Sequence, residues 1–181
     1  GGTTLEALRT RLPAEAGPAT IAGVALVILG VAFKLGAVPA HAWVPDVAQG
    51  APAPVAAFIT AVPKVGAFIF LARFVMVLPP GSLGWELLVA LIATATMTLG
   101  NLASLWQDDV RRLLGWSAVS QTGYGLMAIV ALGRSDLAVP ALLFFLAASS
   151  LGFVATLFLW RFAPGRIGKQ APHGARQDTA T

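Results

Sequence analysis

Apolar residues run in long, uninterrupted stretches along most of this chain. Between residues 17 and 106, Lys, Arg, Asp and Glu occur only as Lys34, Asp46, Lys64, Arg73 and Glu86. A membrane-spanning helix needs about 20 apolar residues. Five segments reach that length, at residues 19–45, 54–78, 83–106, 113–132 and 137–160. The pattern therefore predicts about five transmembrane helices.

Short connectors with turn-forming residues separate these stretches, at 46–53, 78–82, 107–112 and 133–136. Such short connections favour antiparallel neighbouring helices. The apolar runs are continuous, whereas the strands of a membrane barrel alternate apolar and polar residues. We therefore expect an all-α, polytopic transmembrane helical bundle.

Composition supports a membrane protein. Hydrophobic residues make up 57% of the 181 residues and charged residues only 11%, too few to coat a soluble domain. The chain has no cysteine, which excludes thiolate zinc sites and iron–sulfur ligation by this chain. The net charge of +4 comes from basic residues in loops and tail, not from an exposed helix face, so we expect no nucleic-acid partner.

Basic residues beside the spans predict the orientation, because cytoplasmic loops carry more Lys and Arg. One side has Arg9, Arg11, Arg73 and Arg134, and the other has Arg111, Arg112, Arg161, Arg166, Lys169 and Arg176. The second side is predicted to be cytoplasmic. We expect an extracytoplasmic N-terminal segment at 1–18, a transmembrane region at 19–161, and a polar, disordered cytoplasmic tail at 162–181.

Lys34 lies deep in the first predicted span. Its long side chain can reach the membrane interface, or it can line a cavity inside the protein. Pro39 has no N–H to donate to the carbonyl of Leu35, so we expect the helix to break at Pro39. His41 would share the face of Lys34 if the helix continued past the proline, although a single histidine is more often structural.

Lys64 lies about ten residues into the second span, near the middle of the bilayer, where reaching either interface is hardest. Pro63 precedes it and is expected to interrupt or bend the helix. No acidic residue lies at the depth of either lysine, so their partners are expected outside this segment. Burial and neighbouring charges allow lysines to change charge state, so Lys34 and Lys64 are candidate proton-relay residues.

Polar residues at helical spacing follow two further spans. They are Thr94, Thr98 and Asn101 in the third, and Ser117, Ser120, Gln121 and Tyr124 in the fourth. Such stripes either join packed helices by hydrogen bonds or line a chain of water, and the sequence leaves both open. The acids and arginines at 108–112 indicate a solvated turn, and Asp46 is a candidate cap for the next helix.

No phosphate-binding loop, metal-ligand cluster or catalytic triad has a credible context, since His41 and His173 are the only histidines. We therefore expect no substrate bond to be made or broken by this chain alone.

The stretches Phe33–Phe68 and Gly100–Leu126 closely resemble subunit N of the bacterial proton-pumping NADH:quinone oxidoreductase, respiratory complex I. The resemblance covers residues 20–160 and implies part of an antiporter-like fold with inverted repeats and a proline-broken helix. It implies that Lys34 is the lysine of the broken seventh helix and Lys64 that of the eighth, both as proton-relay sites. Related L and M subunits and antiporters usually have histidine where the Val-Pro-Lys ending at Lys64 stands, which favours subunit N.

The resemblance also sets expectations beyond this chain. The family often has histidine where this chain has Gln121, and its fifth-helix glutamate and twelfth-helix lysine fall outside these residues, so we expect a fragment. NADH, FMN, iron–sulfur clusters and quinone would be bound by other subunits. The expected partners are other membrane subunits of complex I and the lipid of the bacterial inner (cytoplasmic) membrane. The alternatives are a subunit of a multisubunit sodium/proton antiporter and a non-functional truncated remnant.

Overall fold

The computed structural model describes residues 17–78, 84–132, 134–135 and 137–162. These residues form six helices: α2 (Pro18–Leu35), α3 (Trp43–Gly50), α4 (Ala53–Val75), α5 (Trp85–Ser104), α6 (Val110–Val130) and α7 (Ala138–Phe162). No strand occurs among the described residues, so the all-α prediction is confirmed. All but the first residue of the predicted tail at 162–181, and nearly all of the predicted N-terminal segment at 1–18, lie outside the described residues.

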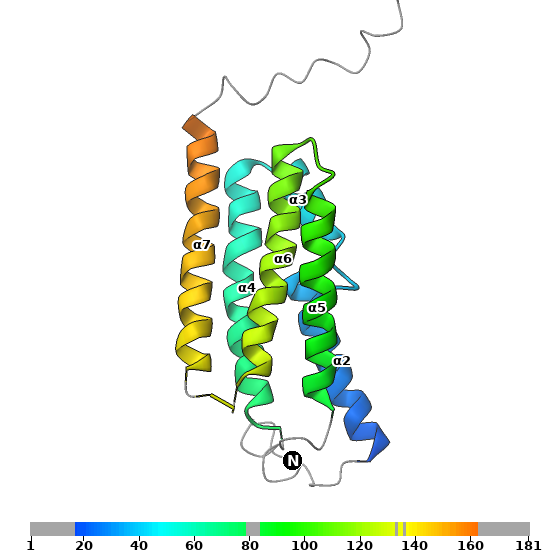
Figure 1. Ribbon diagram of the computed structural model, residues 1–181. Helices are drawn as coiled ribbons and strands as arrows, with labels where there is room; N and C mark the ends of the chain where they lie inside the picture. Colours follow the sequence, from blue (N-terminus) through cyan, green and yellow to red (C-terminus); the bar gives the residue numbers. More distant parts are fainter. Residues whose placement is uncertain (1–16, 79–83, 133, 136, 163–181) are drawn as a thin grey trace, which may run out of the picture.

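The four long helices α4, α5, α6 and α7 stand side by side, and successive helices run in opposite directions (Figure 1). This confirms the antiparallel hairpins expected from the short connectors. Close contacts between small residues join α5 and α6. A Cβ added to Gly100 would lie 2.6 Å from the backbone nitrogen of Ser120, and one added to Gly123 would lie 2.6 Å from that of Met97. Glycine at both positions therefore allows the two backbones to approach closely.

The first predicted span is not one helix. α2 ends at Leu35, and Gly36 follows with a positive φ of 73°, a conformation that glycine adopts without steric cost. The N–H of Gly36 donates to the carbonyl of Phe33, and the N–H of Ala37 donates to that of Ala32, which closes the helix end. The break predicted at Pro39 therefore occurs earlier, at Gly36.

The connector predicted at 46–53 is also wrong in part, because residues up to Gly50 belong to the short helix α3. Pro45 lies in the first turn of α3, where a backbone N–H has no partner within the helix, so proline fits there. α3 and α2 are thus two helical pieces separated by a loop at 36–42.

α4 continues through Pro63 without interruption. The predicted helix break at Pro63 is therefore wrong. Membrane helices tolerate an internal proline because neighbouring helices and local adjustments satisfy the freed backbone groups.

Three described helices are long and apolar enough to cross a membrane, at Pro18–Leu35, Pro54–Val75 and Trp85–Ser104. α6 has 21 residues but is less apolar, because it begins with two arginines and carries several hydroxyl and glycine residues. The apolar portion of α7 found in the described residues is Ala138–Gly152. That α6 and α7 also cross the membrane stays a prediction, supported by their alignment with α4 and α5 (Figure 1).

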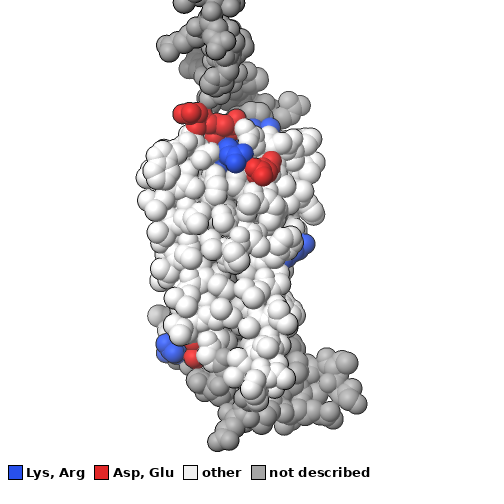
Figure 2. Space-filling model, turned by 90° about the vertical axis from the view of Figure 1, so that its right-hand side faces the viewer, with Lys and Arg blue, Asp and Glu red and all other residues white. Residues whose placement is uncertain are grey.

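The outer surface is largely apolar. Many large hydrophobic side chains are exposed, including Leu26, Phe33, Leu87, Leu91 and Phe144. On the face drawn in Figure 2, charged side chains gather near the two ends and the region between them is almost free of charge. An apolar band between charged ends fits a bundle surrounded by lipid or by other membrane helices, because water would leave that apolar surface unburied.

Candidate functional site

The ammonium group of Lys64 is held inside the bundle by oxygen atoms of α6. Its Nζ donates to the carbonyl oxygen of Ala118 at 2.8 Å and to Oγ1 of Thr122 at 2.9 Å. Both acceptors are neutral, so the charge is solvated by dipoles of the protein. The described residues that surround this group include no carboxylate. Lys64 is therefore hydrogen-bonded but carries an uncompensated charge when it is protonated.

Thr122 lies at the junction of three helices. Its side chain is only 1% exposed, and its Oγ1 lies 3.1 Å from the carbonyl oxygen of Leu35 and 3.0 Å from that of Ala118. Leu35 is the last residue of α2, so its carbonyl is beyond the reach of the helix's own N–H groups. The sequence predicted that Pro39 would leave the carbonyl of Leu35 without a donor in its helix. In the structure, the hydroxyl of Thr122 in α6 donates to that carbonyl.

A second threonine holds the other side of the same loop. Oγ1 of Thr96 accepts a hydrogen bond from the backbone N–H of Val38 at 3.0 Å, and its hydroxyl donates to Ile92 within α5. Thr96 is completely buried. At the interruption after α2, the carbonyl of Leu35 is therefore bonded by Thr122 of α6, and the N–H of Val38 is bonded by Thr96 of α5.

A small cavity of about 30 Å³ lies beside Lys64, between α4, α6 and α7. Its polar lining consists of Thr60, Lys64, Gln121, Thr122, Ser149 and Ser150. One water molecule requires about 10–15 Å³ of such volume and two to four polar partners. The cavity therefore has room for about two water molecules next to the lysine.

A wider groove of about 450 Å³ lies between α6 and α7, lined in part by Ser117, Gln121, Phe144 and Ser149. Gln121 and Ser149 also line the cavity at Lys64. These two side chains therefore lie at both the small cavity and the wider groove.

Sequence reasoning missed Thr60, Thr122, Ser149 and Ser150. Thr60 lies one helical turn before Lys64, so its spacing was a usable signal. Thr122 and the two serines of α7 reach the site only because α4, α6 and α7 pack together, which no spacing within one helix reveals.

Lys34 lies elsewhere, in the last turn of α2, and its side chain is exposed. It lines a groove of about 480 Å³ between α2 and α4, together with Pro63, Gly66 and Phe70. The partial negative charge at a helix C-terminus stabilises a cation there by about 0.3–1 kcal/mol. Because the two linings differ, Lys34 and Lys64 lie in separate hollows on different faces of α4.

His41 packs against Trp116, with 5.4 Å between the ring centroids. Its Nδ1 and the Nε1 of Trp116 are buried and have no hydrogen-bond partner within the described part of the chain. His41 lies in the loop after α2, so the face that it was expected to share with Lys34 does not form.

The predicted polar stripes separate into different environments. Thr94 and Thr98 are exposed, and the hydroxyl of Thr94 donates to Ala90 within its own helix. Asn101 donates from Nδ2 to the hydroxyl of Tyr124 at 3.0 Å, joining α5 to α6 at an exposed position.

In α6, Gln121 reaches the cavity at Lys64 and Ser117 lines the α6–α7 groove. Ser120 is instead buried beside Gly100, and its hydroxyl donates to the carbonyl of Ser117. The predicted stripe of α6 therefore contributes Gln121 to both the cavity and the groove, and Ser117 to the groove alone.

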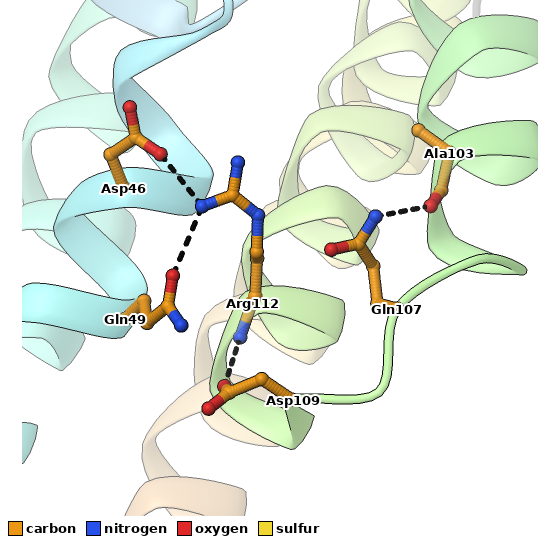
Figure 3. A network of polar contacts seen from close by, with 6 residues as sticks. All are labelled: Asp46, Gln49, Ala103, Gln107, Asp109 and Arg112. Atoms are coloured by element: carbon orange, nitrogen blue, oxygen red, sulfur yellow. Dashed lines mark hydrogen bonds and ion pairs between the residues drawn. The ribbon is translucent and has the colours of Figure 1, made fainter. Parts of the chain in front are cut away.

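A polar network joins α3 to the start of α6 (Figure 3). Arg112 donates from Nη1 to Oδ1 of Asp46 and to Oε1 of Gln49, each at 3.0 Å. The carboxylate of Asp109 accepts from the backbone N–H of Arg112 at 2.9 Å and caps α6. Asp46 lies in the first turn of α3 and pairs with Arg112, so the prediction that it caps the next helix is wrong.

Comparison with known proteins identifies the family of this chain. Residues 1–162 match the model of the family described as "NADH:quinone oxidoreductase/Mrp antiporter, TM". The chain belongs to this family. The match includes every described helix and the residues around both lysines.

The similar curated proteins are named NADH-quinone oxidoreductase subunit N. That of Mycobacterium sp. (strain JLS) is 48% identical over 92% of this chain and 35% of its own length. That of Streptomyces griseus subsp. griseus is 53% identical over 77% of this chain and 30% of its own length. The predicted resemblance to subunit N is thus confirmed, and the chain spans about one third of the length of these relatives.

Two solved structures share the fold. Respiratory complex I from Thermus thermophilus with bound aureothin matches with a TM-score of 0.63 and 30% identity, over 82% of this chain and 36% of that one. An archaeal membrane-bound sulfane sulfur reductase matches with a TM-score of 0.68 and 27% identity, over 76% of this chain and 29% of that one. Both structures are of respiratory membrane complexes. The chain, as a member of this family with several apolar helices, is a multi-pass membrane protein.

Proposed function

We propose that this chain is part of the proton-translocating subunit N of a bacterial NADH:quinone oxidoreductase. The names of the relatives and the likeness to a complex I structure support this assignment. The activity of the whole complex requires segments beyond this third of the subunit. Its own residues contribute a path for protons within the membrane.

The observation that carries the proposal is the environment of Lys64. A charged side chain near the bilayer centre costs about 2.5–3.5 kcal/mol on insertion scales, so it requires a functional or structural reason. Lys64 is bonded to the carbonyl of Ala118 and the hydroxyl of Thr122 instead of to a carboxylate. It can therefore release its proton without leaving an unpaired buried anion behind.

The surroundings of Lys64 also suit proton transfer. Water in the adjacent cavity would be hydrogen-bonded by Thr60, Gln121, Ser149 and Ser150. Gln121 and Ser149 continue into the α6–α7 groove, which also contains Ser117. We assign this water-lining role to Gln121 and Ser117. Neither hollow includes Ser120, Thr94, Thr98, Asn101, Tyr124 or His41 in its lining.

Lys34 is the second proposed relay residue. It lies at the C-terminal end of α2, beside the break at Gly36, and faces the groove that contains Pro63. An ammonium group at a helix C-terminus, in a hollow between helices, is held at lower cost than one surrounded by lipid. Helix ends inside transporters commonly bind ions in this way.

Redox chemistry would take place on other subunits. In this proposal NADH, FMN, the iron–sulfur clusters and quinone are bound elsewhere, and neighbouring antiporter-like subunits pack against the apolar surface of this one. The end that contains Arg111, Arg112 and α3 would face the cytoplasm of a bacterial inner membrane, because basic residues gather on the cytoplasmic side.

The test uses the complete subunit assembled in its complex. Lys64→Ala should abolish most NADH-driven proton uptake into inverted membrane vesicles, measured by a pH-sensitive dye, while the complex still assembles. Arg134→Ala is the matched control, since Arg134 is exposed and pairs only at 3.8 Å with Glu86 at the bundle end. Normal pumping by assembled Lys64→Ala complexes would reject the relay role of Lys64.

A sodium/proton antiporter subunit is the second candidate, because the family description includes the Mrp antiporters. The same vesicles distinguish the two. Proton uptake that requires NADH and stops with an inhibitor of quinone reduction supports complex I. Proton movement driven by an imposed sodium gradient without NADH supports the antiporter.

A further inference from the structure

Among the described residues, the hydroxyl of Thr122 links the side chain of Lys64 to the C-terminal end of α2. It lies 2.9 Å from Nζ of Lys64, 3.1 Å from the carbonyl oxygen of Leu35 and 3.0 Å from that of Ala118. A hydroxyl group has a single proton to donate. It can therefore donate a hydrogen bond to only one of these groups at a time.

The protonation state of Lys64 decides how the hydroxyl is used. An ammonium group has three donors and no acceptor, so Thr122 must accept from a protonated Lys64 and point its own proton at a carbonyl. Ala118 already accepts from Lys64 at 2.8 Å, which leaves the Leu35 carbonyl as the group in need of a donor. A neutral amine has a lone pair, so the hydroxyl of Thr122 can then turn towards Lys64.

The carbonyl of Leu35 has few other donors. The N–H groups of Gly36 and Ala37 donate to Phe33 and Ala32, that of Val38 donates to Thr96, and Pro39 has none. When Thr122 turns away, this buried carbonyl loses the hydrogen bond that it makes with the side chain. Loss of a buried hydrogen bond costs enough to favour a different arrangement of the loop.

We propose that Thr122 is a positioning residue that transmits the charge state of Lys64 to the C-terminal end of α2, and so to Lys34 beside that end. This inference rests on the proposed function, because it requires Lys64 to gain and lose a proton. The hydrogen bond from the N–H of Val38 to Thr96 anchors the far side of the loop to α5. The movable part is thereby limited to the end of α2 near Leu35.

No other titratable group competes for this role among the described residues around Lys64. α6 contributes Ala118, Gln121 and Thr122 to its cavity, and α7 contributes Phe145, Leu146, Ser149 and Ser150. Lys34 faces the separate groove on the other face of α4. Electrostatic influence between the two lysines across α4 would not depend on the hydroxyl of Thr122, so removing that hydroxyl separates the two routes.

The experiment compares Thr122→Val, Thr122→Ser and Thr94→Val in the complete subunit within the assembled complex. Proton uptake per NADH oxidised is measured in vesicles across a range of pH. Thr122→Val should move the pH dependence of proton uptake towards lower pH by about one unit, because the ammonium loses one acceptor. Thr122→Ser, which keeps the hydroxyl, should restore the wild-type profile. Thr94→Val should leave the profile in place, because Thr94 is exposed and its hydroxyl donates to Ala90 within α5.

A double-mutant test addresses the transmission itself. If Thr122 acts through the end of α2, Thr122→Val should add no further loss of proton uptake to Lys34→Ala, because coupled residues have non-additive effects. Independent, additive losses overturn the proposal. An unchanged profile in assembled Thr122→Val complexes also overturns it.

The variant Lys64→Ala distinguishes failure of the transmission through Thr122 from failure of the proposed function. If Lys64→Ala abolishes proton uptake while Thr122→Val behaves as wild type, only the transmission through Thr122 is rejected. If Lys64→Ala pumps normally, the relay role is rejected together with the inference that rests on it.

Discussion

Nη1 of Arg112 lies 3.0 Å from Oδ1 of Asp46, and this pair joins the first turn of α6 to the first turn of α3. The side chains are 37% and 64% exposed, so water and salt weaken their attraction. Arg112 also bonds Gln49, which keeps it in place when Asp46 is changed.

Asp46→Asn should therefore lower the stability of the subunit by no more than about 1 kcal/mol, the range of exposed ion pairs. Thermal unfolding of the purified complex, measured with Asp46→Asn, Arg112→Gln and the double variant, gives the coupling energy. Failure of Asp46→Asn to assemble would show that the pair has a structural role that its exposure does not indicate.

Gly115 is a stronger constraint on the position of α3. A Cβ added there would lie 2.6 Å from Cα of Pro45 and 3.0 Å from Cβ of Ala48. Gly115→Ala should push α3 away from α6 and destabilise the subunit by about 1–3 kcal/mol, the usual cost of overpacking. The measurement is the melting temperature and yield of the assembled complex.

Gly23→Ala is the matched control, since nothing lies within 4 Å of a Cβ added at that position of α2. It should leave assembly intact, because alanine is the better helix former. Equal losses in Gly115→Ala and Gly23→Ala would contradict the close packing of α3 on α6.

Gln121 should be sensitive to the chemistry of its replacement. It lines both the cavity at Lys64 and the α6–α7 groove. Gln121→Leu removes the groups that orient water there and should reduce NADH-driven proton uptake several-fold. Gln121→His keeps a hydrogen-bonding side chain and should retain more of the activity. Equal activity of the leucine and histidine variants would mean that water at Gln121 does not carry the proton.

The pair formed by Asn101 and Tyr124 should be unimportant for proton transfer. Its hydrogen bond of 3.0 Å lies at an exposed position, and neither residue lines the cavity at Lys64. Tyr124→Phe removes the hydroxyl with little change in volume and should leave proton uptake per NADH unchanged. Reduced uptake in an assembled Tyr124→Phe complex would place a second proton path between α5 and α6.

The sequence by itself determined the all-α membrane architecture, the antiparallel hairpins and the two lysines, because long apolar runs and isolated charges are local features of a chain. It also indicated that the first span is interrupted near Lys34. It misjudged the detail, since Gly36 ends α2 through its positive φ, whereas Pro63 is accommodated within α4.

Only the tertiary structure decided which polar groups meet. Thr122 lies 58 residues from Lys64 and 87 from Leu35 along the chain, yet it contacts both because α2, α4 and α6 pack together. Stripes such as Thr94 and Thr98 were equally polar in sequence but face outwards. The spacing of residues along a helix predicts which of them share a face. Which other helix that face contacts depends on the packing between helices, and the spacing gives no information about it.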